Sequence, residues 1–145
     1  HDYAKVYASV DAYFQDLDQI GQMVQEEIGY VPCFIRFPGG SSNTVSKKYT
    51  AGIMSTLVQE VQNRGYQYYD WNGSSGDGSV RTTEELVAQA TSFDSNNIIL
   101  LCHDSHGKQT TVEALPQIIE HYQSLGYTFK ALDRDSFVAH HGVNN

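Results

Sequence analysis

Residues 98–104 read Ile98-Ile99-Leu100-Leu101-Cys102-His103-Asp104, a fully apolar run that ends in a polar pair. A short apolar run of this kind is typical of a buried strand, and we expect a strand over 98–102. In parallel α/β folds, functional side chains gather at the carboxyl ends of the strands. His103 is therefore a candidate general acid or base. The alternative interpretation is a hydrogen-bonded histidine on the rim of the sheet.

Helix-like and strand-like segments alternate on both sides of this strand. Apolar residues at helical spacing predict helices over 10–28, 46–64, 82–91 and 110–124. Short apolar or aromatic runs predict further strands over 33–35, 66–71 and 127–132. This alternation predicts parallel βα units in an α/β fold without an internal linker. Because the first predicted element is a helix, we expect that an N-terminal portion is missing.

Polar residues at several helix ends support these boundaries. Ser9 suits the N-cap of the helix over 10–28, and Gly29 suits the position after its end. Capping boxes are predicted at Thr82-x-x-Glu85 and Thr110-x-x-Glu113. Pro116 should then lie in the first helical turn or mark a kink.

Two other predicted strands also lead into polar residues. The strand over 33–35 precedes Arg36-Phe37-Pro38-Gly39-Gly40, and the strand over 66–71 ends in Asp70-Trp71, ahead of a Gly/Ser-rich loop with Asp77. A hydrolytic site can be assembled from these ends. A carboxylate would orient His103, Arg36 would hold an anion, and the N–H groups of Gly39 and Gly40 would face a developing oxyanion. Alternatively, Arg36 forms a structural salt bridge and Pro-Gly-Gly is a plain turn.

Composition excludes some classes of partner. The sequence carries 9 Lys and Arg against 17 Asp and Glu, a formal net charge of −8. Nucleic-acid binding depends on clustered cations, so we expect no nucleic-acid partner, and a neutral or weakly charged polymer suits this surface better. No run of 18 apolar residues predicts a transmembrane segment.

Histidines and cysteines add little to the site. His106, His121 and the pair His140-His141 lack ligand-like spacing with a third residue, and we expect the pair to be exposed or packed. Cys33 and Cys102 lie in apolar runs and are interpreted as buried thiols rather than a disulfide.

Four motifs stand in order along the chain: His1-Asp2-Tyr3, Arg36 to Gly40, Tyr69-Asp70-Trp71 through Asp77, and Leu101-Cys102-His103-Asp104. In this order and spacing they resemble the motifs of polysaccharide deacetylases (NodB homology, carbohydrate esterase family 4). Residues 110–132 resemble the helix and strand that close that domain. The resemblance implies a distorted (β/α) barrel that is incomplete at the N-terminus, with residues 1–145 as the C-terminal part of one domain.

The resemblance also implies roles for individual residues. His103 matches the general acid, Asp77 the carboxylate that orients it, and Arg36 the arginine that contacts the catalytic base. Gly39 matches the residue whose N–H contributes to the oxyanion hole, although the family often has tyrosine there.

Other matched positions bind substrate or metal. Trp71 resembles the aromatic wall of the acetyl pocket. Leu101 matches the leucine of the last motif, and Pro38 matches a substrate-binding position of the arginine motif. His1 matches one of two metal-binding histidines.

By this resemblance the chain is part of a zinc-dependent hydrolase that removes N-acetyl groups from a polysaccharide, most simply the N-acetylglucosamine of peptidoglycan, outside the cell or at its envelope. The sequence contains no Asp-Asp-Gly-Pro motif and no histidine four residues before His1. A catalytic zinc takes three protein ligands, so we expect weak zinc binding and no activity from this chain alone. Alternatives are a degenerate glycan-binding domain and a deacetylase of chitin oligomers or acetylated xylan. An open barrel edge also predicts self-association.

Overall fold

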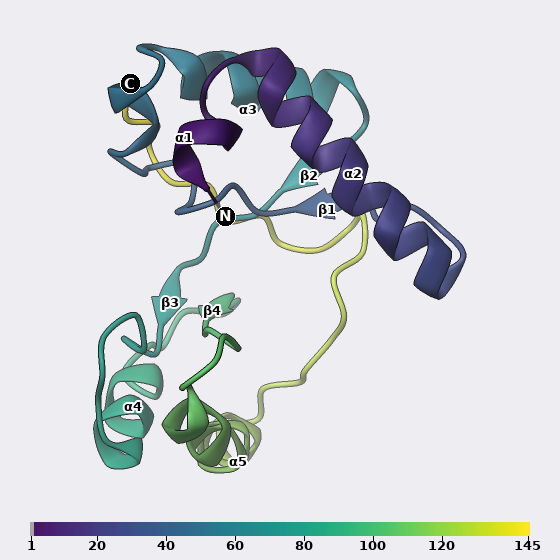
Figure 1. Ribbon diagram of the computed structural model, residues 1–145. Helices are drawn as coiled ribbons and strands as arrows, with labels where there is room; N and C mark the ends of the chain where they lie inside the picture. Colours follow the sequence, from purple (N-terminus) through teal and green to yellow (C-terminus); the bar gives the residue numbers. More distant parts are fainter. Residues whose placement is uncertain (1) are drawn as a thin grey trace. The chain divides into compact units, whose positions relative to one another are not determined.

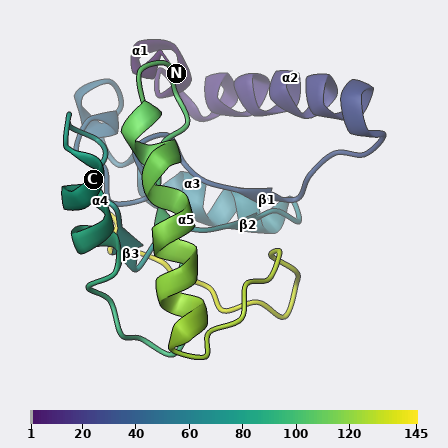
Figure 2. The same cartoon turned by 90° about the horizontal axis from the view of Figure 1, so that it is seen from below.

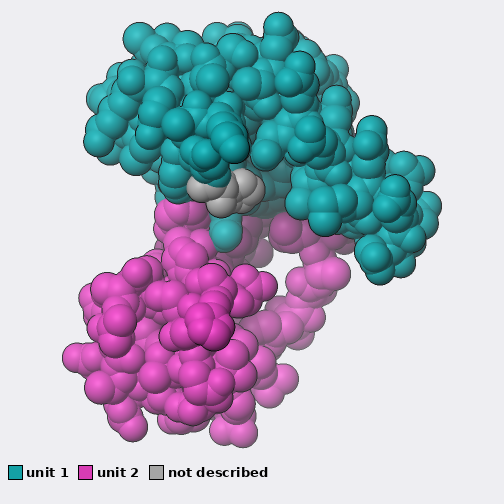
Figure 3. Space-filling model, viewed as in Figure 1, with its two compact units in different colours: residues 1–70, 140–145 teal, residues 71–139 magenta. Residues whose placement is uncertain are grey.

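The computed structural model describes residues 2–145. The chain divides into two compact units, which Figure 3 shows in different colours. The first unit comprises the chain up to Asp70 together with His140–Asn145, and the second comprises Trp71–Ala139.

The first unit packs helices against a pair of parallel strands. Its elements are α1 (Tyr3–Val6), α2 (Val10–Ile28), β1 (Phe34–Ile35), the 3₁₀ helix η1 (Ser46–Lys48), α3 (Ile53–Asn63) and β2 (Gln67–Tyr68). Phe34 pairs with Gln67, and Ile35 pairs with Tyr68. In Figure 1, α2 and α3 lie on the same side of this strand pair. The core between them includes the fully buried side chains of Phe37, Met54 and Leu57.

The second unit is smaller and repeats the same plan. Its elements are β3 (Gly73–Ser74), α4 (Thr83–Ala90), β4 (Leu100–Leu101) and α5 (Gln109–Ser124). Strands β3 and β4 pair in parallel. Helices α4 and α5 lie side by side in both views (Figures 1 and 2), and their core contains Leu86, Ala114 and Ile118. The hydroxyl of Tyr122 joins the two helices by donating to the carbonyl of Ala90 at 2.7 Å.

Several predictions from the sequence are confirmed. Helix α2 has the predicted bounds, and the Ser9 hydroxyl accepts a hydrogen bond from the Ala12 N–H at 3.0 Å. Gly29 ends α2 in the left-handed conformation, with φ of 86°. Thr82 and Glu85 form the predicted capping box of α4. Both strand pairs are parallel, so the α/β class is confirmed. The two cysteines are free thiols as predicted, although each is half-buried rather than buried.

The predicted helix over 46–64 is wrong in its first part. It divides into η1 and α3, because Gly52 precedes α3 in the left-handed conformation with φ of 75°. An α-helix cannot continue through that backbone conformation.

The second capping box, at Thr110 and Glu113, is also wrong. Lys108 is the N-cap of α5, and no side chain caps this end. The Glu113 carboxylate instead accepts a hydrogen bond from Thr83 of α4 at 3.1 Å, so contact between the two helices replaces the local cap.

Pro116 lies in the interior of α5 rather than in its first turn. Its ring removes the N–H that would bond to the Val112 carbonyl. Val112 is 57% exposed, so a water molecule can donate to its carbonyl in place of the missing N–H. The helix therefore continues through Pro116 to Ser124.

The strand predicted over 127–132 is wrong. The structure has no strand in this segment, which lines a hollow of about 770 Å³ together with residues of α5 and β4. Within the described residues β4 pairs only with β3. Residues 127–132 therefore have no neighbouring strand with which to form backbone hydrogen bonds. Leu100 and Leu101 are half-buried for the same reason, and not buried as predicted. None of the helices within residues 2–145 has the length and apolar character needed to cross a membrane.

Candidate active site

The parallel pairing of β3 and β4 places their carboxyl ends next to each other. Asp77 follows β3 by a short turn, and His103 follows β4. The His103 ring nitrogen Nδ1 lies 2.7 Å from Asp77 Oδ1, and the His103 backbone N–H donates to Asp77 Oδ2 at 2.7 Å. The Asp77 side chain is only 2% exposed, whereas the His103 side chain is 39% exposed. One member of the pair is therefore sequestered and the other is open to a ligand.

Asp77 is ionised in this environment. Burial alone raises the pKa of Asp77, but hydrogen bonds from His103, Ser75 and Thr111 outweigh it and lower the pKa below its ordinary value. An ionised carboxylate only accepts hydrogen bonds, so Nδ1 of His103 must carry the proton that it shares with Asp77. This tautomer leaves Nε2 as the ring nitrogen that can exchange a proton with a ligand.

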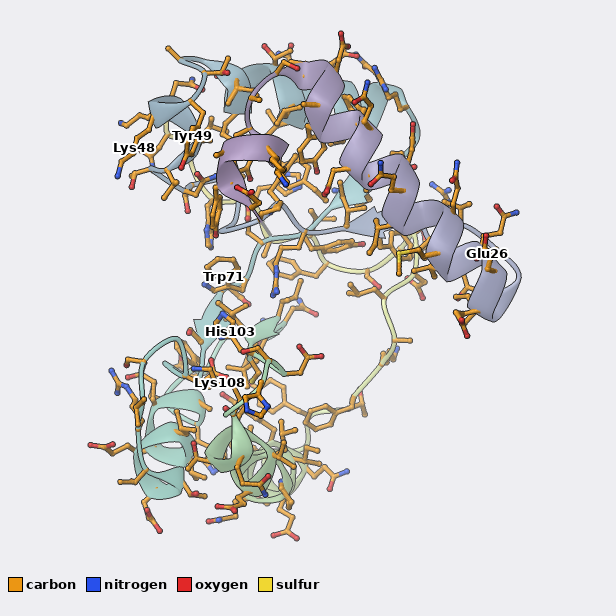
Figure 4. All side chains as sticks on the ribbon, viewed as in Figure 1. Glu26, Lys48, Tyr49, Trp71, His103 and Lys108 are labelled. Atoms are coloured by element: carbon orange, nitrogen blue, oxygen red, sulfur yellow. The ribbon has the colours of Figure 1, made fainter. Side chains whose placement is uncertain are left out.

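Helix α5 also contacts Asp77. The Thr111 hydroxyl donates to Asp77 Oδ2 at 3.0 Å, and the Lys108 ammonium donates to the Asp77 backbone carbonyl. Figure 4 labels His103, Lys108 and Trp71 in this unit. Lys108 and Thr111 were not among the site residues predicted from the sequence. The signal that could have found them is their position at the start of the helix that follows the candidate acid, since such helix ends adjoin the strand carboxyl ends.

The first unit contains the turn that follows β1. The Tyr7 hydroxyl donates to the Pro38 carbonyl at 2.7 Å, and the Asn43 side-chain amide donates to the Gly40 carbonyl at 2.9 Å. Gly39 has φ of 77°, and a Cβ there would lie 3.1 Å from both Asn43 Cβ and the Tyr3 hydroxyl. Glycine is thus required at position 39 of this chain by backbone conformation and by space.

One of the two predicted oxyanion donors is excluded. The Gly40 N–H donates to the Phe37 carbonyl at 2.7 Å, which closes the turn and makes this group unavailable to a ligand. For Gly39, no intramolecular hydrogen bond from its N–H occurs within residues 2–145. Only the Gly39 N–H is therefore kept as a candidate oxyanion donor.

Asp70 has a structural role that the sequence analysis did not anticipate. Its carboxylate is 1% exposed and accepts hydrogen bonds from the Ser41 N–H at 2.8 Å, the Ser41 hydroxyl at 2.5 Å and the His141 N–H at 2.9 Å. These bonds join the turn after β1 and the C-terminal residues to the end of β2. Asp70 therefore anchors this turn.

The sequence-predicted site residues are divided between the two units. Arg36, Pro38 and Gly39 belong to the first unit, whereas Trp71, Asp77, Leu101 and His103 belong to the second. The structure brings Asp77 and His103 into contact.

The remaining predicted residues have different surroundings. Arg36 is exposed and lines a hollow of about 200 Å³ with Tyr13, Asp16 and Pro38. Trp71 is half-buried, and Leu101 pairs with Ser74 across the second strand pair. The predicted metal ligand His1 lies outside the described residues.

The described residues do not form a metal site by themselves. In the part of the chain from residue 2 onward, no three His, Cys, Asp or Glu side chains form a group that could hold a metal ion. His140 stacks on Tyr68 with 3.8 Å between ring centroids, in line with the prediction that the His140-His141 pair is exposed or packed.

Comparison with solved structures finds this fold in proteins that include a deacetylase domain and an esterase. The whole chain superimposes on 67% of the catalytic domain of peptidoglycan N-acetylglucosamine deacetylase from Eubacterium rectale ATCC 33656, with a TM-score of 0.95 and 44% identity. A Streptococcus mutans CE4 esterase shares the fold, with a TM-score of 0.71 and 24% identity over 88% of this chain and 57% of that protein.

Comparison with curated sequences also finds relatives that are named as deacetylases. The protein YheN of Bacillus subtilis (strain 168), which carries the name polysaccharide deacetylase, is 24% identical over 97% of this chain. A bifunctional xylanase/deacetylase of Pseudobutyrivibrio xylanivorans is 36% identical over 73% of this chain. The chain spans 48% of the length of YheN and 17% of the bifunctional enzyme. No protein-family model matches the sequence. The identity and coverage shared with the Eubacterium rectale domain nevertheless show that the chain belongs to the polysaccharide deacetylase family, carbohydrate esterase family 4.

Proposed function

We propose that this chain contributes the acid half of an active site that hydrolyses N-acetyl groups on a polysaccharide. The observation that carries this proposal is the contact between buried, ionised Asp77 and half-exposed His103, 2.7 Å apart at adjacent strand ends. Deacetylation must protonate the departing amine, which is a poor leaving group as an anion. An imidazolium that is held at Nδ1 can give this proton from Nε2.

The proton transfer follows from the arrangement of the pair. A water molecule attacks the acetamide carbonyl and would lose its proton to the catalytic base. His103 Nε2 protonates the amine nitrogen as its bond to the carbonyl carbon breaks. Acetate and a free amine result. Asp77 keeps the Nδ1–H oriented and stabilises the positive charge of the ring. General acid catalysis of this kind contributes roughly 10²–10⁴-fold.

The first unit is proposed to assist this chemistry. The Gly39 N–H would donate to the oxyanion of the tetrahedral intermediate, and Arg36 would orient the catalytic base. Trp71, Leu101 and Pro38 would line the acetyl pocket. These roles, and the barrel that would bring the residues together, rest on the family resemblance.

Generation of the nucleophile requires further groups. We propose that zinc and a base aspartate fulfil this role in the complete catalytic domain, and that the 145-residue chain alone binds zinc weakly and is inactive. Support comes from the missing Asp-Asp-Gly-Pro motif and from the share of each relative that this chain spans.

Peptidoglycan N-acetylglucosamine is the proposed substrate, because the solved relative at 44% identity is described as a deacetylase of that sugar. Such a polymer implies action outside the cell or at its envelope. Acetylated xylan is the second candidate, since the relative at 36% identity is a xylanase/deacetylase. Chitin oligomers and a purely glycan-binding role are the remaining alternatives.

Self-association is a further proposal, supported by the apolar side chains that α2 exposes. Ile20, Met23 and Ile28 are 49%, 61% and 52% exposed. Light scattering that finds only monomers at high concentration would exclude it.

Acetate release from peptidoglycan, chitin oligomers and acetylated xylan by the full-length natural protein tests the function. We expect release from one of these polymers, and loss of that release in His103→Ala and His103→Gln without loss of bound metal. His106→Ala changes an exposed histidine of the same loop and serves as the matched control. Normal turnover in both His103 variants would refute the acid assignment. Glycan binding without acetate release from any polymer would favour the binding role.

A further inference from the structure

The Asp77 carboxylate is held by two separate segments of the second unit. The segment after β4 supplies the His103 side chain to Oδ1 and the His103 N–H to Oδ2. The first turn of α5 supplies the Thr111 hydroxyl to Oδ2 at 3.0 Å. The two carboxylate oxygens are therefore differentiated, with Oδ1 facing the imidazole and Oδ2 held by the backbone and by α5.

Thr111 is well placed for this contact. It is the third residue of α5 and is only 3% exposed, so water does not compete for Asp77 at this position. Its hydroxyl donates directly to a carboxylate, a charge-assisted hydrogen bond that is stronger than one between neutral groups. The neighbouring Lys108 holds the Asp77 backbone carbonyl from the same helix end.

We propose that Thr111 is a positioning residue for the general acid: its hydroxyl fixes the Asp77 carboxylate so that Oδ1 holds the Nδ1–H of His103. The catalytic significance of this contact rests on the proposed function, whereas the contact itself and its effect on Asp77 do not. Thr111 does not touch the substrate in this proposal and acts only through Asp77 and His103.

The charges around Asp77 support this assignment. The pKa of Asp77 is lowered although burial alone would raise it, and Thr111 is one of the hydrogen-bond donors that lower it. Among the described residues, His103 and Lys108 are titratable groups that hydrogen-bond to Asp77. The pKa of Cys102 is raised by burial first and by the charge of Asp77 second. Removal of the Thr111 hydroxyl leaves these groups in place, so any change in Asp77 reports the lost hydrogen bond.

The competing explanation is that Thr111 only fills space at the start of α5. Two substitutions separate these roles. Thr111→Val keeps the branched shape and removes the donor, whereas Thr111→Ser keeps the donor and removes a methyl group. Thr110→Val makes the same change at the preceding residue, whereas among the described residues the α5 side chain that donates to the Asp77 carboxylate is that of Thr111.

NMR of the 145-residue chain measures the effect without any need for activity. We expect the Asp77 carboxyl carbon to titrate at higher pH in Thr111→Val than in wild type, and the Nδ1–H proton of His103 to exchange faster with water. Thr111→Ser and Thr110→Val should match wild type in both measurements. If Thr111→Val does not fold, Thr111→Ala provides the same comparison. Unchanged Asp77 titration and His103 exchange in the donor-free variant would overturn the proposal.

Kinetics of the full-length natural protein connect the contact to catalysis. Loss of a hydrogen bond to a charged group should lower kcat about tenfold in Thr111→Val and leave KM unchanged, with activity restored in Thr111→Ser. A rise in KM without a fall in kcat would contradict a positioning role. If the protein releases no acetate but the NMR changes occur, the contact is upheld and the proposed function is what fails.

Discussion

The imidazole of His103 lies 2.7 Å from the carboxylate of Asp77, although 26 residues separate them in the chain. Parallel pairing of β3 with β4 produces this contact, because it aligns the two strand ends from which the residues emerge. The pair is also asymmetric: the carboxylate is sequestered and the imidazole is open to solvent. These conditions suit a residue that must hold a proton and pass it to a ligand.

Acid stability should depend on Asp77. A carboxyl group whose pKa is lowered on folding stabilises the folded state above its unfolded pKa of about 3.9, and this stabilisation is lost as the pH falls through the folded value. Wild type should therefore lose more stability than Asp77→Asn on acidification below about pH 4. The melting temperatures of both proteins at a series of pH values between about 2 and about 7 measure this difference. If the melting temperatures of the two proteins fall in parallel as the pH is lowered, the hydrogen bonds to Asp77 do not stabilise the folded state.

Gly39 should tolerate no side chain. Gly39→Ala must adopt the left-handed conformation, which costs about 1–2 kcal/mol, and its Cβ must also displace Asn43 or Tyr3. Gly52→Ala is the matched control in the same unit, because its φ of 75° imposes the same backbone cost while nothing lies within 4 Å of the new Cβ. Urea unfolding should show the larger loss of stability for Gly39→Ala. Equal losses of stability in the two variants would mean that the contacts of the new Cβ with Asn43 and Tyr3 do not destabilise the turn.

Asp70 should be essential for the turn that carries Gly39. Asp70→Asn replaces a charged acceptor of three hydrogen bonds with an amide, one end of which cannot accept. Each buried hydrogen bond to a charged group contributes about 1.5–3 kcal/mol, so we expect a loss of at least that size in the free energy of unfolding. Asp18→Asn, an exposed position on α2, should have little effect. A variant at Asp70 as stable as the control would remove its anchoring role.

Zinc content tests the proposed metal dependence. The 145-residue chain should retain much less than one zinc per chain after dialysis, since a stable catalytic site takes three protein ligands and the described residues provide no such group. Elemental analysis of the chain and of the full-length natural protein, prepared in parallel, makes the comparison. Stoichiometric zinc held by the chain alone would contradict the expectation.

The sequence by itself was sufficient for helices α2 and α4, and it named His103 and Asp77 as candidates for one site. Apolar spacing and local caps define α2 and α4, because a helix hydrogen-bonds within its own segment and its ends depend on adjacent residues. His103 could be singled out because it follows a buried strand, at whose end parallel sheets place functional side chains. Asp77 was named as its partner through the resemblance to the deacetylase motifs.

Only the tertiary structure decided which polar groups are free for chemistry. The Gly40 N–H is used within its own turn, Asp70 serves as an anchor, and Thr111 donates to the Asp77 carboxylate. The same is true of residues 127–132, which have the composition of a strand but no neighbouring strand to pair with in the described part of the chain. These outcomes depend on residues that are distant in sequence. A local pattern does not specify which hydrogen-bond donor a buried carboxylate will meet, or whether a strand-like segment will have a neighbouring strand.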